Sequence, residues 1–167
     1  MSAETFTTAM FLITAVIAAG VLVNAVFPVV YNMAGTFSSA THDSDERLRT
    51  DFKIVTYTAT NSGIPHATVW LKNIGSSRIS MSDFTNRSDV FCGDVGAFER
   101  LTWASSASSS GQWTNVNYDT NNNNYWDPGE TIQVIAYSST ITPTSSVYFQ
   151  FILPSGVYRT VEFNAAG

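Results

Sequence analysis

The sequence has little charge: Asp, Glu, Lys and Arg make up only 13% of its 167 residues, about half the usual quarter of a soluble domain. The deficit is concentrated near the N-terminus, where no charged side chain occurs between Glu4 and Asp43. This distribution excludes one evenly mixed globular domain. It leaves an uncharged N-terminal segment followed by roughly 125 residues, enough for one domain with a core of its own.

Basic residues, cysteine and histidine are also scarce. The eight Lys and Arg residues are scattered and outnumbered by thirteen Asp and Glu, which argues against nucleic-acid binding, because phosphates require a basic face. The single cysteine, Cys92, cannot form an intramolecular disulfide, and we expect it to be a small buried hydrophobe.

Catalytic motifs are absent as well. The two histidines stand apart from Cys92 and from carboxylates at metal-ligand spacing. The sequence contains no glycine-rich phosphate loop, no nucleophile elbow and no Cys–His arrangement. We therefore expect neither an enzyme nor a site for a small-molecule substrate.

The uncharged segment contains a long apolar run at residues 6–31. As a helix it would be about 39 Å long, ample for a hydrocarbon core of about 30 Å. It is apolar on every side and too long for the apolar region of a removable secretory signal, so we expect it to be retained. The run predicts either a membrane span or a helix buried among copies of itself.

Two features of this run indicate helix packing. Ala15, Ala19 and Gly20 form a small-residue patch that would let another helix approach closely, although alanine is also simply common in membrane spans. Asn24 is the stronger indication, because its amide is costly in lipid unless it is hydrogen-bonded. We expect a homo-oligomer or a filament in which these helices meet.

The residues after Tyr31 allow two interpretations. Gly35 and the serines that follow it could end the helix, or the helix could continue as a stalk, because apolar residues recur near one helical face as far as Val55. We divide the chain into an N-terminal helix at 1–41, a connector at 42–50 and a β domain at 51–167.

From Asp51 the pattern changes to short runs rich in β-branched and aromatic residues, each bounded by Gly, Pro, Ser or Asn. About seven to nine such runs, with no helical stretch between them, predict an all-β fold. Specifically, we expect an immunoglobulin-like antiparallel β-sandwich preceded by one long N-terminal hydrophobic α-helix. The turn formed by Pro154, Ser155 and Gly156 predicts that the last two strands form a hairpin.

The composition of the β domain indicates its location. Its predicted strands carry many Thr and Ser at outward positions and little Lys or Glu, as in an exported domain. Asn86-Arg87-Ser88 is a sequon, which makes Asn86 a candidate N-glycosylation site. The cations after the helix are interleaved with acids and give only a weak preference for the cytoplasm. We expect the helix in the membrane or in a filament core, and the β domain outside the cell.

The most specific local pattern is DTNNNNYWDPGE, at residues 119–130. Oxygen-bearing groups fall at positions one, three, five, seven, nine and twelve, the spacing by which a twelve-residue loop binds Ca²⁺. Position six, usually Gly because the chain turns sharply there, is Asn124, the next best residue at positive φ. A polar hairpin loop is the alternative. The candidate Ca²⁺ ligands are Asp119, Asn121, Asn123, Tyr125, Asp127 and Glu130.

Three stretches of the sequence are AETFTTAMFLITAVIAAGVLVNAVFPVVY, VWLKNIG and WDPGETIQV. Together they resemble archaeal flagellar (archaellum) accessory proteins of the FlaG/FlaF type, which are related to archaellins. The resemblance implies a structural component of the motility apparatus, a membrane-anchored, stator-like protein. Its β domain would bind surface-layer protein or its own copies. Archaellins carry a basic leader before the apolar helix, and no Lys or Arg precedes Phe6 here, which favours the accessory type.

Two other functions stay open. The chain could be an archaellin or pilin-type filament subunit whose N-terminal helices pack in the filament core. It could also be a surface carbohydrate-binding module that uses an exposed tryptophan, although most tryptophans of a sandwich pack in its core. The four tryptophans are Trp70, Trp103, Trp113 and Trp126.

Overall fold

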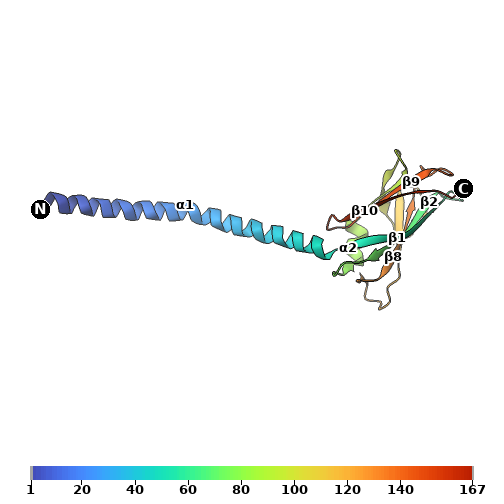
Figure 1. Cartoon of the computed structure of the whole chain (residues 1–167), viewed down its shortest axis with the longest axis horizontal. Coiled ribbons are helices and arrows are strands. Elements are labelled where there is room, and N and C mark those ends of the chain that lie inside the picture. Colours follow the sequence, from blue (N-terminus) through green and yellow to red (C-terminus); the bar gives the residue numbers. More distant parts are fainter. Residues whose placement is uncertain (1, 167) are drawn as a thin grey trace. The chain divides into compact units, whose positions relative to one another are not determined.

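One helix, α1 (Ser2–Arg49), covers the uncharged segment and continues almost to the first strand (Figure 1). The structure, a computed structural model, describes residues 2–166, apart from the side chains of residues 2, 38–40, 42 and 43. Packing divides the chain within this helix, into Met1–Ser44 and Asp45–Gly167. Of the two interpretations of the residues after Tyr31, the second applies, because the helix passes Gly35 without a break.

The N-terminal part of α1 is apolar and exposed on all sides. The stretch Ala3–Phe37 is long and apolar enough to cross a membrane, judged by length and composition. Phe11 and Val16, for example, are each 73% exposed. The hydroxyls of Thr7 and Thr14 donate to backbone carbonyls four residues earlier, at 2.9 and 2.8 Å, so these donors are satisfied within the helix. The apolar surface needs lipid or other helices to cover it.

In the described part of Asp45–Gly167, ten strands and one short helix follow α1. The short helix contradicts the prediction that no helical stretch separates the strands, whereas the antiparallel hairpin of the last two strands is confirmed. The elements are β1 (Phe52–Thr60), β2 (His66–Asn73), β3 (Ile79–Ser80), α2 (Met81–Arg87), β4 (Asp89–Asp94), β5 (Glu99–Trp103), β6 (Gln112–Asn117), β7 (Tyr125–Trp126), β8 (Thr131–Tyr137), β9 (Ser146–Ile152) and β10 (Tyr158–Asn164).

Eight of these strands form one sheet in the order β1-β2-β8-β6-β5-β4-β9-β10. All neighbouring pairs are antiparallel except β5 and β6, which pair in parallel at Thr102 and Trp103. The expectation of a purely antiparallel domain is therefore wrong at this pair, which joins the two halves of the sheet. β3 and β7 form a separate two-stranded sheet.

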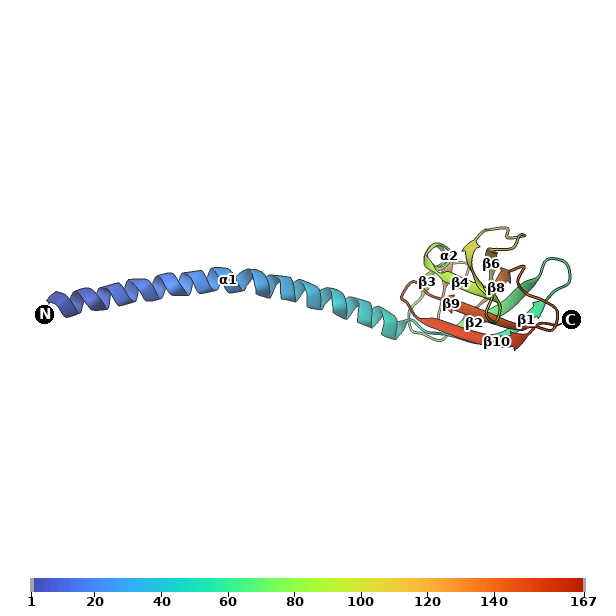
Figure 2. The same ribbon diagram turned by 90° about the horizontal axis from the view of Figure 1, so that it is seen from above.

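The sheet curls until its two outer strands, β1 and β10, lie near each other (Figure 2). The ring centroids of Tyr57 and Phe163 are 4.5 Å apart, and Ala166 forms a parallel bridge with Thr60. The domain is thus an antiparallel-rich β-sandwich that nearly closes into a barrel. An all-β domain behind one long helix is confirmed.

The core lies between the two halves of the curled sheet. Phe84 of α2 is fully buried there, and its ring stacks on Phe151 of β9 with centroids 5.0 Å apart. It also meets Trp113 and Trp126 edge to face, at 6.0 and 5.3 Å. The short helix therefore contributes the centre of an aromatic cluster. The largest fully buried side chains are Trp113, Trp126, Phe52, Phe84, Phe149, Phe151, Leu71, Leu101, Ile132, Ile141, Leu153 and Val69.

Cys92 lies in this core on β4, as expected. Burial raises the pKa of its thiol to about 12, because the thiolate would lose its hydration in an apolar site. The ordinary pKa of the thiol is 9.0. Above that pH the unfolded chain releases a proton that the folded chain keeps.

Alkaline pH should therefore destabilise the β domain through Cys92. The effect is absent below pH 9 and grows as the pH rises toward about 12, at no more than about 1.4 kcal/mol per pH unit. We expect the free energy of unfolding to fall more steeply over this range in the wild type than in Cys92→Ala, as measured by urea denaturation at each pH. Parallel pH profiles of the two proteins would contradict this assignment.

Candidate functional site

The residues predicted to pack helices fall on two sides of α1. Successive positions of a helix are rotated by about 100°, so Ala15 and Ala19 share one face, and Gly20 and Asn24 share another about 140° away. All four residues are exposed, and a Cβ at Gly20 would meet no atom within 4 Å. A helix that approached closely at Gly20 would meet the Asn24 amide one turn later.

The 119–130 loop joins β6 to β8 and includes β7. Asp119 organises its first half, because its carboxylate accepts hydrogen bonds from the backbone N–H groups of Asn121, Asn122 and Asn124 at 2.8–3.1 Å. Asn124 has a φ of 63°, the left-handed conformation expected where a calcium loop normally has glycine. Asparagine tolerates this conformation, so the replacement of glycine is accommodated.

The other carboxylates close the loop. Oδ2 of Asp127 accepts hydrogen bonds from the side-chain amides of Asn121 and Asn123 at 3.0 and 2.6 Å. These two bonds, helped by the charge of Arg78, lower the pKa of Asp127. Glu130 accepts from the backbone N–H of Asp127 at 3.0 Å. The predicted side chains are therefore brought together in one hydrogen-bonded loop.

The oxygen atoms of this loop are of the chemical kind that binds a hard cation. Carboxylate, amide and carbonyl oxygens are the ligands that Ca²⁺ prefers. Among the side chains that the structure describes, no group of three or more His, Cys, Asp or Glu is placed to hold a metal ion. An ion here would thus depend on amide and carbonyl oxygens, and it would have to displace the two amide N–H groups beside Asp127.

Buried residues attach the loop to the domain. Trp126 is fully buried, and its indole N–H donates to the carbonyl of Glu130 at 3.0 Å. The side chain of Asn73, buried at the end of β2, donates to the carbonyl of Trp126 at 3.0 Å. The carbonyl of Tyr125, the expected ligand at position seven, accepts a long hydrogen bond of 3.5 Å from Asn117. The second half of the loop is therefore anchored from beneath.

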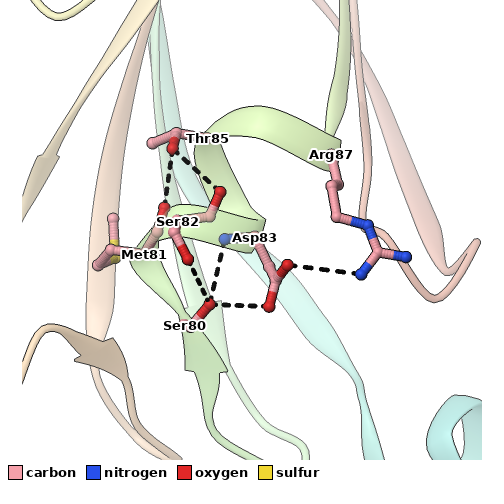
Figure 3. A network of polar contacts seen from close by, with 6 residues as sticks. All are labelled: Ser80, Met81, Ser82, Asp83, Thr85 and Arg87. Carbon is pink, nitrogen blue, oxygen red and sulfur yellow. Dashed lines mark hydrogen bonds and ion pairs between the residues drawn. The ribbon is translucent and has the colours of Figure 1, made fainter.

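The short helix α2 begins at a side-chain cap (Figure 3). Oγ of Ser80 accepts a hydrogen bond from the backbone N–H of Asp83 at 3.1 Å and donates to its carboxylate at 2.8 Å. Asp83 also pairs with Arg87 one turn later, at 3.4 Å. A serine followed three residues later by an acid is a sequence signal for a helix start. This signal could have found α2, which hydrophobic periodicity misses.

Asn86, the candidate glycosylation site, lies in α2 with its side chain exposed. The third residue of its sequon, Ser88, is only 8% exposed. The Ser88 hydroxyl has no hydrogen-bond partner among the described residues. The enzyme that attaches the sugar must reach both the asparagine and the serine of the sequon. The sugar would therefore have to be added before α2 and β4 pack.

A hollow of about 170 Å³ lies on another side of α2. Glu46 and Asp83 line it together with Arg78 and Arg87. The two acids offset the two bases, so the hollow offers no net charge to attract a charged substrate.

Comparison with known proteins gives a consistent result. A model of the archaeal-type flagellin family matches residues 4–163. The chain is 25% identical over 170 residues to an uncharacterized protein of Archaeoglobus fulgidus, a match that covers 98% of this chain and 99% of that protein.

Two solved structures from Sulfolobus acidocaldarius resemble the chain. The archaellum periplasmic stator protein FlaG shares 26% identity with a TM-score of 0.52, over 68% of this chain and 99% of that chain. The periplasmic stator complex of FlaF and FlaG shares 24% identity with a TM-score of 0.52, over 67% and 87%. Both solved structures are of periplasmic stator proteins of the archaellum.

Proposed function

Because the chain belongs to the archaeal-type flagellin family and is an archaellum component related to the stator proteins FlaG and FlaF, we propose that it is a membrane-anchored, stator-like part of that apparatus. In this proposal α1 anchors the chain in the cell membrane. The β domain, an immunoglobulin-like sandwich, lies outside the cell and binds surface-layer protein or its own copies. The likeness to FlaG at 26% identity, over 99% of that chain, carries the proposal.

The features of the two parts support this arrangement. The apolar stretch Ala3–Phe37 has the length and composition of a membrane span. The hydroxyl-rich surface of the β domain suits a location outside the cell, and we propose that Asn86 carries an N-linked glycan there. A protein partner within the archaellum is supported by the structural neighbour in which FlaF and FlaG form a complex.

The second candidate function is that of a filament subunit. The match to the flagellin family along residues 4–163 supports it. The two separate faces of α1, one with Ala15 and Ala19 and one with Gly20 and Asn24, also suit a helix that packs among several neighbours.

Fractionation of archaeal cells separates the two functions. The full chain, tagged at its C-terminus, is followed after the filaments have been sheared off and banded on a density gradient. We expect the chain to stay in the membrane pellet and its tag to be removed by protease added to intact cells. Recovery in the filaments as a major subunit would establish the alternative, and a tag protected in intact cells would contradict the proposed orientation.

We also propose that the 119–130 loop binds Ca²⁺. The ligands would be the side chains of Asp119, Asn121, Asn123, Asp127 and Glu130, with the carbonyl of Tyr125. The support is the left-handed Asn124 at position six and the all-oxygen donor set. With few charged ligands, the site would suit the calcium-rich surroundings outside a cell.

Calcium should therefore raise the melting temperature of the full chain. A ligand that binds only the folded state at 100 times its Kd adds about 2.7 kcal/mol of stability. We expect the rise at about 1 mM calcium, within the range of extracellular sites, and we expect Glu130→Gln to lose most of it. Glu162→Gln, an exposed change on β10, is the matched control. Melting curves that are identical with calcium and with a chelator would contradict the site.

A further inference from the structure

A shallow groove of about 480 Å³ is lined by residues of α2, β5, β6 and the 119–130 loop. Its volume is in the range of small-molecule sites, roughly 300–1,000 Å³. None of the described residues that line it is charged. Its walls carry one large aromatic ring, four asparagine amides and several hydroxyls. The groove is therefore polar but without charged side chains, unlike the hollow lined by Asp83 and Arg78.

Trp103 forms the aromatic wall of this groove. It is 38% exposed, whereas Trp113 and Trp126 are buried in the core. Its indole N–H donates to the side-chain oxygen of Asn115 at 3.0 Å. This bond holds the ring in one orientation, so that Trp103 offers a fixed flat surface without a side-chain rearrangement.

Asn117 also lines the groove and holds an acceptor without a partner among the described residues. Its Oδ1 is buried and has no hydrogen-bond partner among the described residues. Its Nδ2 reaches only the carbonyl of Tyr125, at 3.5 Å. A buried acceptor without a donor is unfavourable. The oxygen is closed to solvent, so a ligand hydroxyl can donate to it only after the Asn117 side chain turns toward the groove, a turn that the new hydrogen bond would favour.

We propose that this groove binds the ring of a neutral sugar. A flat aromatic surface matches the C–H face of a pyranose, and amides such as Asn115 and Asn117 match its rim of hydroxyls, because amides both donate and accept. A charged ligand would find no counter-ion there, and a purely apolar ligand would leave the amides unpaired. The inference does not depend on the stator proposal.

The sugar could come from two sources. Asn86 lies on the rim of the groove, so a glycan attached to it could fold back onto Trp103. Alternatively, the groove could take a glycan from another surface molecule. The 119–130 loop forms part of the groove wall through Asn124. The backbone carbonyl of Asn124 accepts a hydrogen bond from the N–H of Met81, which joins the loop to the start of α2.

Fluorine NMR of the full chain labelled with 5-fluorotryptophan tests the proposal. The protein is kept in a detergent without a sugar head group, and its four tryptophan signals are assigned by single Trp→Phe changes. Methyl α-mannoside, methyl β-glucoside and methyl β-galactoside are the probes. We expect at least one to shift the Trp103 signal saturably, while those of Trp113 and Trp126 stay in place. The absence of a saturable shift with every probe up to about 10 mM, in the wild type and in Asn86→Gln alike, would overturn the site.

Matched variants show whether the groove is responsible. Trp103→Ala should abolish binding, and Asn117→Ala should weaken it about tenfold or more. Trp70→Ala and Asn164→Ala, which change the same residue types elsewhere, should bind as the wild type does. The proposal would be overturned if the control variants lost as much sugar affinity as the groove variants, or if the groove variants lost none.

The two sources of sugar give different results when the protein is produced in archaeal cells. If the glycan on Asn86 fills the groove, Asn86→Gln binds the probes and the wild type does not, which supports the site with an internal ligand. If both proteins bind alike, the site takes a glycan from elsewhere. If neither protein binds, the proposal is wrong.

Discussion

Replacing Phe84 with alanine is expected to lower the free energy of unfolding of the β domain by about 3–5 kcal/mol. The side chain is fully buried and lies between Phe151, Trp113 and Trp126. Its removal would leave a cavity that these stiff rings cannot collapse to fill. Urea denaturation of the full chain in detergent, followed by tryptophan fluorescence, measures the loss.

Phe98→Ala is the matched control for this change. Phe98 also contacts an aromatic ring, Tyr148, with centroids 4.6 Å apart, but it is 47% exposed. Its removal leaves no closed cavity, so we expect a loss of about 1 kcal/mol or less. If the two variants lost the same stability, Phe84 would not be the centre of the core.

Gly75→Ala should be the second most damaging change, at about 3 kcal/mol or more. A Cβ at this position would lie 2.6 Å from the backbone nitrogen of Asp51 and closer still to the carbonyl oxygen of Arg49. Both are backbone atoms and cannot rotate away. The N–H of Gly75 also donates to the carbonyl of Asp51 and to the side chain of Asn73, each at 2.9 Å, so any shift would strain these bonds. Thermal melting followed by circular dichroism measures the effect.

Gly63→Ala separates this clash from ordinary backbone strain. Gly63 has a φ of 79°, and a Cβ there would meet no atom within 4 Å. The substitution should therefore cost only the strain of a left-handed residue, about 1–2 kcal/mol. A loss as large as that of Gly75→Ala would mean that contact with Arg49 and Asp51 is not the cause.

The spacing of apolar residues was sufficient to predict one long helix and the longer strands, but not the two-residue strands β3 and β7. An uncharged run dictates one apolar helix, and the alternation of residues along β8 and β9 directs Val134 and Phe149 inward. The helix α2 is different, because seven residues are too few for a helical period to be recognised. The helix forms because Ser80 caps its start and because Phe84 fills a space between aromatic rings. That space is made by strands far away in the sequence.

The candidate sites divide in the same way. The 119–130 loop is local, so residue spacing alone was enough to name its candidate ligands and to place the turn at Asn124. The groove is assembled from Trp103, Asn117 and α2, which are far apart in the sequence. The parallel pairing of β5 with β6 sets Trp103 opposite Trp113, yet only Trp113 is buried, and no local pattern in the sequence encodes that difference.

The direct join of α1 to β1 determines how the β domain carries mechanical load. Only Thr50 and Asp51 separate the helix from the strand, and the carbonyls of Arg49 and Asp51 each accept two backbone N–H groups from residues 74–77. Tension that arrives through α1 therefore acts on β1 at its N-terminal end. This strand is paired with β2 from Phe52 to Thr60, so a pull along it loads many ladder bonds together. Forced unfolding is governed by the barrier to unfolding, and this shared loading raises that barrier when the domain is pulled through α1.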